Sequence, residues 1–206
     1  MIKEKLGPQI DGWIHTVFPF LFWRPINPDV LTLVGMLIAG TAGLAFAEGA
    51  FRLGGWLLVA GSFFDLVDGV VARHFEISTR FGAFLDASLD RIVDILVMLG
   101  LLVFYVREPS SVGVGLCTVI LVASVLTSYA KARAELVLDR MPGGLLERGE
   151  RVGLLAAGAI LGWVWPVLWV LAVGTVVTVA QRFLYAYREM ARLDCEERAE
   201  PWRQTK

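Results

Sequence analysis

Residues 65–73 read DLVDGVVAR, and residues 82–90 read GAFLDASLD. Each stretch places two aspartates in otherwise apolar sequence. On a helix, Asp65 and Asp68 share one face, and so do Asp86 and Asp90, because residues three or four apart are neighbours on a helix surface. If the two segments pack side by side, all four carboxylates can converge on one point.

Four clustered negative charges need neutralising. One interpretation is that they pair with Arg73, Arg80 and Arg91 at a membrane surface. A charged side chain at the centre of a membrane helix costs roughly 2.5–3.5 kcal/mol, so four carboxylates on two helix faces favour a binding site over incidental ion pairs. Because the candidate ligands are carboxylate oxygens, we expect a hard divalent cation, Mg²⁺ or Mn²⁺.

The composition indicates a membrane protein. The chain has 206 residues, 56% of them hydrophobic, and a mean hydropathy of +0.64, which is too apolar for an ordinary soluble domain. The net charge of -1 gives no sign of a nucleic-acid partner. Cys117 lies in an apolar run and Cys195 in a polar tail, so they do not form a disulfide framework. The length allows one domain, residues 1–206.

The expected fold is an all-α integral membrane protein with six transmembrane helices and an N-terminal amphipathic interfacial helix. Apolar residues recur at helical spacing from Ile2 to Val17, and residues 18–23 continue as an aromatic belt, so residues 1–26 are predicted to lie on the membrane surface. A six-span core at 27–187 follows, and then a charged tail at 188–206 that is predicted to be helical or frayed. The spans are predicted at about 28–47, 53–73, 81–106, 110–135, 151–163 and 165–187.

The distribution of basic residues predicts the orientation. With six spans, all of the 19 Lys and Arg residues except Arg52, Arg91 and Arg107 lie on the side that carries both termini, or at the helix ends flanking it. Basic residues favour the cytoplasmic side, so both termini and the four acids are predicted to face the cytoplasm at the plasma membrane.

The acidic stretch resembles the signature of the CDP-alcohol phosphotransferase family, Asp-x2-Asp-Gly-x2-Ala-Arg-x8-Gly-x3-Asp-x3-Asp. Eight fixed positions over 26 residues make the match very specific. All eight are present: Asp65, Asp68, Gly69, Ala72, Arg73, Gly82, Asp86 and Asp90.

The resemblance implies transfer of the phosphatidyl group of a CDP-linked lipid, CDP-diacylglycerol, to an alcohol, with release of CMP. It implies a homodimer and two Mg²⁺ (or Mn²⁺) ions held by Asp65, Asp68, Asp86 and Asp90, with Asp90 also the catalytic base. The CDP-lipid contacts that it implies are Asp29, Thr32, Asp68, Gly69, Ala72, Arg73, Thr79 and Gly82.

Several cations near the predicted active-site side suggest which alcohol is used. Arg suits bidentate phosphate binding, although cations at these helix ends could also be simple membrane anchors. Their combination resembles the phosphatidylinositol-phosphate synthase branch, which implies inositol phosphate as the acceptor. The predicted acceptor-phosphate residues are Lys131, Arg133, Arg151 and Arg182.

Three functions remain open from sequence. The first is a phosphatidyltransferase that uses inositol phosphate. The second is the same chemistry with glycerol phosphate as acceptor, or with an ether-lipid CDP donor. The third is a cation transporter, but a transporter should carry its acids near mid-membrane in broken helices related by a repeat. Here the acids are predicted near one surface, and no repeat is evident.

Overall fold

The computed structural model describes residues 27–75, 77 and 79–199. These residues form six helices and no strand, which confirms the all-α class. The predicted interfacial helix at 1–26 lies outside the described residues. The helices are α2 (Pro28–Ala47), α3 (Phe51–His74), α4 (Arg80–Arg107), α5 (Ser111–Ala134), α6 (Arg148–Leu161) and α7 (Val164–Ala199).

Local sequence explains where these helices begin and end. At α2, the Asn27 side chain accepts a hydrogen bond from the Asp29 amide (3.0 Å), and Pro28 occupies the first turn. At α6, Glu147 and Glu150 form a reciprocal capping box, and Gly162 ends the helix in the left-handed region at φ 79°. A residue with a Cβ would be strained there.

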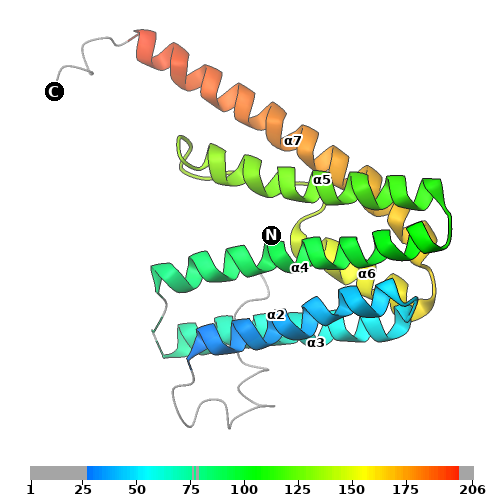
Figure 1. Ribbon diagram of the computed structural model, residues 1–206. Helices are drawn as coiled ribbons and strands as arrows, with labels where there is room; N and C mark the ends of the chain where they lie inside the picture. Colours follow the sequence, from blue (N-terminus) through cyan, green and yellow to red (C-terminus); the bar gives the residue numbers. More distant parts are fainter. Residues whose placement is uncertain (1–26, 76, 78, 200–206) are drawn as a thin grey trace.

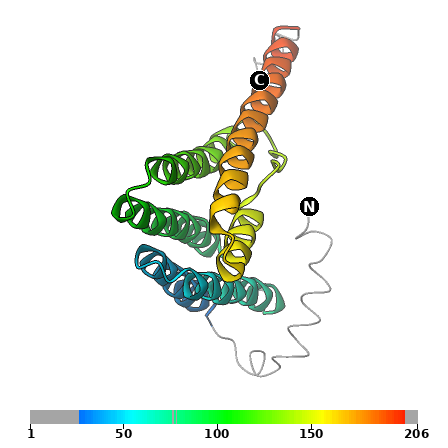
Figure 2. The same ribbon diagram turned by 90° about the vertical axis from the view of Figure 1, so that its right-hand side faces the viewer.

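Helix α2 packs along both α3 and α4, while α7 packs against α5 and α6 (Figure 1). The connections α2–α3, α4–α5 and α6–α7 lie at one end of the bundle, and α3–α4 and α5–α6 lie at the other (Figure 1). Figure 2 shows α7 slanting across the other helices and continuing beyond them. The end that holds the α3–α4 connection is therefore the end that carries the acidic stretch.

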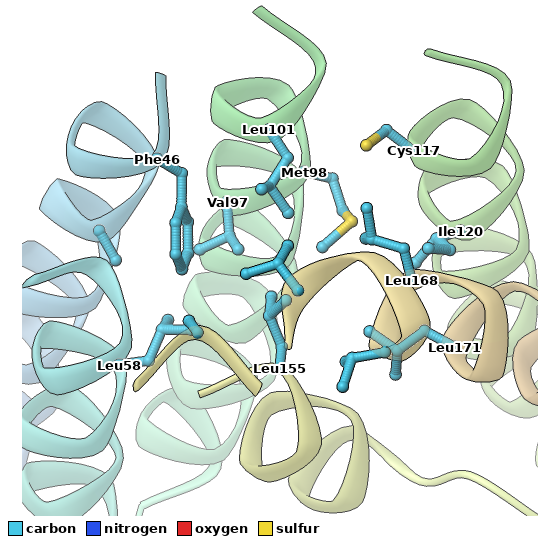
Figure 3. Close-up of a cluster of buried hydrophobic side chains, with 14 of the residues drawn as sticks. Phe46, Leu58, Val97, Met98, Leu101, Cys117, Ile120, Leu155, Leu168 and Leu171 are labelled. Carbon is cyan, nitrogen blue, oxygen red and sulfur yellow. The ribbon is translucent and has the colours of Figure 1, made fainter. Parts of the chain in front are cut away.

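Two kinds of contact hold the bundle together. Glycines allow close helix crossings: a Cβ on Gly100 of α4 would overlap the carbonyl oxygen of Gly43 in α2. Large apolar side chains fill the centre, and Phe46, Leu101 and Leu168 are fully buried there (Figure 3). The acids lie between this core and the α3–α4 connection. Packing in the core holds the helices that carry the acids in place.

Within the described part of the chain, four helices are long and apolar enough to cross a membrane: α2, α3, α5 and residues Val164–Glu196 of α7. The six-span count is therefore supported only in part. Helix α4 has 28 residues but carries four charged side chains between residues 86 and 94: Asp86, Asp90, Arg91 and Asp94. Helix α6 has 14 residues, which at 1.5 Å per residue spans about 21 Å, short of a hydrocarbon core of about 30 Å.

Helix α7 continues past residue 187, the predicted end of the last span, into the tail that was predicted to be helical or frayed. Residues Tyr185, Ala186, Met190 and Leu193 pack against Ala134, Leu138 and Met141, at the end of α5 and just beyond it. This small apolar cluster stabilises the extension of α7 to Ala199.

Candidate active site

Three of the four signature aspartates form one cluster. Oxygens of Asp65 and Asp68 on α3 and of Asp86 on α4 all lie within 4.8 Å of one another. Asp68 is buried, and the other two are half-buried. Three carboxylates this close repel each other, and they are the oxygen donors that a hard divalent cation requires. The donor set therefore fits a divalent metal.

The two acidic segments meet through α2, which packs against both helices that carry them. Thr32 of α2 donates its hydroxyl hydrogen toward Asp68 Oδ2 (2.5 Å), and the same hydroxyl lies 3.0 Å from the Pro28 carbonyl oxygen. Thr32 thus fixes the orientation of one carboxylate in the cluster. A threonine that orients a metal-binding carboxylate is typical of a preorganised metal site.

Asp90 lies beside the cluster and pairs with a cation. Its Oδ1 is 2.8 Å from Nη2 of Arg148, the first residue of α6. Arg148 Nη1 also lies 3.7 Å from Asp65 Oδ2. A guanidinium group therefore bridges Asp90 and the acid cluster. The sequence predicted that Asp90 would join the other acids, but it did not predict this arginine.

A pocket of about 460 Å³ opens next to the acid cluster. Seven of the eight residues predicted to contact the CDP-lipid line it: Asp29, Thr32, Asp68, Gly69, Ala72, Thr79 and Gly82. Asp86 of the acid cluster lies in the same wall. The eighth, Arg73, lies beside the pocket, because a Cβ on Gly69 would be 3.3 Å from Arg73 Nη1.

Two wall residues have local structural roles as well. Thr79 caps α4, and its hydroxyl oxygen accepts a hydrogen bond from the Gly82 amide (2.8 Å). Gly82 leaves little room around itself, since a Cβ there would lie 3.0 Å from Asp29 Oδ1 and 3.1 Å from Thr79 Oγ1. The glycine lets α2 and α4 approach at the pocket wall, and it leaves the backbone open to a ligand.

Two of the predicted acceptor-phosphate residues, Arg151 and Arg182, are buried. Arg182 Nη1 donates to the Thr127 carbonyl oxygen of α5 (2.5 Å). The positive charges of Arg151 and Arg91 lie close enough to act on Arg182. Among the described residues, nothing accepts a hydrogen bond from Arg91 Nη1 or Arg182 Nε, although both atoms are buried. Buried cations with unused donors suit an anionic ligand.

Lys131 and Arg133, the other two predicted residues, are exposed at the end of α5. Lys131 lies one turn after Thr127, so its helix position is next to the carbonyl that binds Arg182. Its ammonium group is 3.8 Å from Glu135. A role for either residue in a phosphate pocket stays a prediction.

The sequence reasoning missed Arg148 and Arg91 as candidate site residues. Arg148 lies in the stretch 147–151, which alternates glutamates and arginines, and Arg91 directly follows Asp90. Arg91 was considered only as an ion-pair partner of the four acids, and not as part of an acceptor site. The partners of Arg148 and Arg91 depend on how α4, α6 and α7 come together, which the local pattern does not specify.

Comparison with known proteins agrees with this geometry. The sequence model described as CDP-alcohol phosphatidyltransferase matches residues 25–181, which include every signature position. The chain belongs to the CDP-alcohol phosphatidyltransferase family. As a member of this family it is a phosphatidyltransferase enzyme, and the transporter interpretation is set aside.

Among the relatives of this CDP-alcohol phosphatidyltransferase is the phosphatidylinositol phosphate synthase of Mycobacteroides abscessus. The two are 41% identical over 165 residues, which cover 76% of this chain and 75% of the relative.

Two crystal structures of the Mycobacterium tuberculosis phosphatidylinositol phosphate synthase resemble the fold, each with a TM-score of 0.73. One has CDP-DAG bound and is 32% identical, covering 87% of this chain and 92% of the other. The second is in complex with manganese and citrate and is 33% identical, covering 87% and 88%.

Proposed function

We propose that this enzyme transfers the phosphatidyl group of CDP-diacylglycerol to a hydroxyl of inositol phosphate and releases CMP. One observation carries the proposal: the acid cluster adjoins the large pocket through Asp68 and Asp86, while Arg148 pairs with Asp90 and shares Asp94 with the buried Arg151. A donor diphosphate and an acceptor phosphate would thus meet at the carboxylates. The similar M. tuberculosis structure has CDP-DAG bound, which supports CDP-diacylglycerol as the proposed donor.

In the proposed reaction, the acceptor's hydroxyl oxygen attacks the phosphatidyl phosphorus, and the bond to the CMP oxygen breaks. Asp65, Asp68 and Asp86 would hold divalent cations, Mg²⁺ or Mn²⁺ and two in number, with Asp90 near the second. When bound, such cations neutralise charge that develops on the attacking and leaving oxygens. Asp90 takes the hydroxyl proton as general base.

The remaining residues position the two substrates. Asp29, Thr79 and Gly82 face the nucleotide in the pocket, together with Thr32, Gly69 and Ala72, and Arg73 holds a phosphate of the CDP group. Arg151 and Arg182 hold the acceptor's phosphate, with Lys131 and Arg133 at the rim. Binding both substrates in one geometry supplies much of the catalytic effect in phosphoryl transfer.

We further propose one membrane domain over residues 1–206 that crosses the plasma membrane six times, with α4 and α6 as the two additional crossings. The alternation of helix connections between the two ends of the bundle supports this topology (Figure 1). The asymmetry of Lys and Arg supports cytoplasmic termini and a cytoplasmic active site. The protein is proposed to act as a homodimer.

A CMP-release assay with a panel of alcohols tests the proposed function. The purified protein is supplied with CDP-diacylglycerol and, in separate reactions, with inositol phosphate, glycerol phosphate, inositol and glycerol. We expect CMP release with inositol phosphate and little with the unphosphorylated alcohols. Turnover of glycerol phosphate without turnover of inositol phosphate would keep the reaction and change the acceptor. No CMP release with any alcohol would refute the proposed reaction.

A further inference from the structure

Asp94 lies on α4 one turn after Asp90 and is outside the family signature. Its two carboxylate oxygens contact two different arginines of α6. Oδ2 is 3.0 Å from Arg151 Nη2, and Oδ1 is 3.7 Å from Arg148 Nε. The side chain of Asp94 is 10% exposed and that of Arg151 is 8% exposed, so their ion pair is largely shielded from water. A shielded, hydrogen-bonded pair fixes geometry better than a surface pair does.

The two arginines face different parts of the site. Arg148 reaches Asp90 (2.8 Å) and Asp65 (3.7 Å) in and beside the acid cluster. Arg151 lies close enough for its charge to act on Arg182, and it also donates to the Leu146 carbonyl oxygen (3.2 Å). Asp94 is therefore a common partner of Arg148, which contacts the acid cluster, and of Arg151, which lies near Arg182.

The ion pairs of Arg148 and Arg151 connect two helices, α6 and α4, that otherwise pack mainly against other helices. Helix α6 packs against α3 and α7, and α4 packs against α2 and α5. Long side chains from α6 cross to α4 at Asp90 and Asp94. If Asp94 loses its charge, the partner that Arg151 keeps among the described residues is the Leu146 carbonyl oxygen. Arg148 then keeps its ion pairs with Asp90 and Asp65. Both guanidinium groups could then adopt other rotamers.

We propose that Asp94 is a positioning residue for phosphatidyl transfer, holding Arg151 at the acceptor's phosphate and Arg148 at Asp90. One carboxylate thereby fixes the distance between the bound phosphate and the group that takes the hydroxyl proton. The proposal rests on the proposed function, because it requires a phosphorylated acceptor.

The test is a double-mutant cycle on the full-length enzyme with Asp94→Asn, Arg151→Gln and the double variant. Wild type is first assayed with inositol phosphate and with glycerol phosphate, and the acceptor that it uses becomes the probe. Asp94→Asn is expected to raise the acceptor KM roughly tenfold and to lower kcat, while the KM for CDP-diacylglycerol changes less than about twofold. Asp94→Glu, which keeps the charge, should recover part of the loss.

The cycle separates positioning from simple stabilisation. If Asp94 acts through Arg151, the acceptor KM of the double variant should equal that of Arg151→Gln within about twofold. The matched control is Asp139→Asn, which removes an exposed carboxylate from the α5–α6 connection and should change neither constant.

Two results would overturn the proposal. One is an additive rise of the acceptor KM in the double variant, and the other is a lower melting temperature for Asp94→Asn with both kinetic constants unchanged. If the wild-type enzyme is active, either result refutes the positioning role of Asp94 and leaves the proposed function standing. If wild type uses neither phosphorylated acceptor, the proposed function fails, and this proposal fails with it.

Discussion

Replacing Arg182 with glutamine tests the acceptor pocket directly. Among residues 27–75, 77 and 79–199, the Arg182 guanidinium makes one hydrogen bond, from Nη1 to the Thr127 carbonyl oxygen (2.5 Å). A hydrogen bond from a charged group contributes roughly 1.5–3 kcal/mol. Arg182→Gln would lose that contribution, and it would remove both the attraction of Glu147 and Glu135 and the repulsion of Arg91 and Arg151, which oppose each other. We therefore expect only a modest fall in melting temperature, on the order of a few degrees.

The effect on acceptor binding should be much larger. A phosphate carries up to two negative charges, and loss of one charge-assisted contact to it costs roughly 1.5–3 kcal/mol, or ten- to a hundredfold in kcat/KM. The measurement is steady-state CMP release with CDP-diacylglycerol fixed and inositol phosphate varied, then with the roles exchanged. We expect the acceptor kcat/KM to fall ten- to a hundredfold and the KM for CDP-diacylglycerol to stay within about twofold.

The controls for Arg182 lie on the same helix. Arg188→Gln removes an exposed cation six residues further along α7 and should leave the acceptor kinetics unchanged. Arg182→Lys keeps the charge but loses the planar fork, so we expect an intermediate loss. An unchanged acceptor KM and kcat/KM in Arg182→Gln would mean that Arg182 only anchors α7 at the membrane surface, and the pocket would be refuted.

Three further predictions concern the donor side of the site. Chelation of divalent metal should abolish CMP release, and added Mg²⁺ or Mn²⁺ should restore it; full activity after thorough stripping would contradict a metal site. Asp86→Asn should abolish turnover and weaken metal binding measured by calorimetry. Asp90→Asn should also abolish turnover but leave CDP-diacylglycerol binding largely intact, and near-normal turnover of this variant would exclude Asp90 as the base. Gly82→Ala should raise the KM for CDP-diacylglycerol several-fold, because the new Cβ would lie 3.0 Å from Asp29 Oδ1. The control Gly153→Ala, whose Cβ would have nothing within 4 Å, should leave this KM unchanged, and an equal KM in the two variants would argue against a donor pocket at Gly82.

Helix boundaries were the most predictable part of the fold, because membrane spans have a strong apolar signal. Helix α2 was predicted at 28–47 from the Asn27-Pro28-Asp29 start and has these bounds in the structure. The end of α7 was less predictable, because it depends on apolar contacts of Met190 and Leu193 with residues at and beyond the end of α5. Such contacts join segments about 50 residues apart in the sequence.

The membrane span count was harder to predict than the helices themselves. Helix α4 combines an apolar second half with Asp86, Asp90, Arg91 and Asp94, so composition alone does not identify it as a span. A functional site can place charged residues in a membrane helix, where they are energetically unfavourable. Hydropathy then no longer identifies that helix as a membrane span.

Candidate site residues were predictable where they share one helix face. The spacing of Asp65 and Asp68 was enough to place their carboxylates together. The role of α2 was not, because the local pattern does not reveal that α2 packs against both acidic helices or that Thr32 reaches Asp68. Arg148 was missed for the same reason, since its partners lie on α3 and α4.

The charge balance of the site bears on the proposed number of metal ions. Five carboxylates (Asp65, Asp68, Asp86, Asp90 and Asp94) are accompanied by Arg148 and Arg151 as paired cations, which leaves an excess of three negative charges if all are ionised. One divalent cation would still leave the site negative before the anionic diphosphate of the donor arrives. Two would make it slightly positive, so that the donor is attracted rather than repelled. Asp94 and its two arginines contribute one net positive charge to this balance, and they place it between the acid cluster and the proposed acceptor pocket. The same network can therefore limit repulsion among the acids and orient the groups that bind the acceptor.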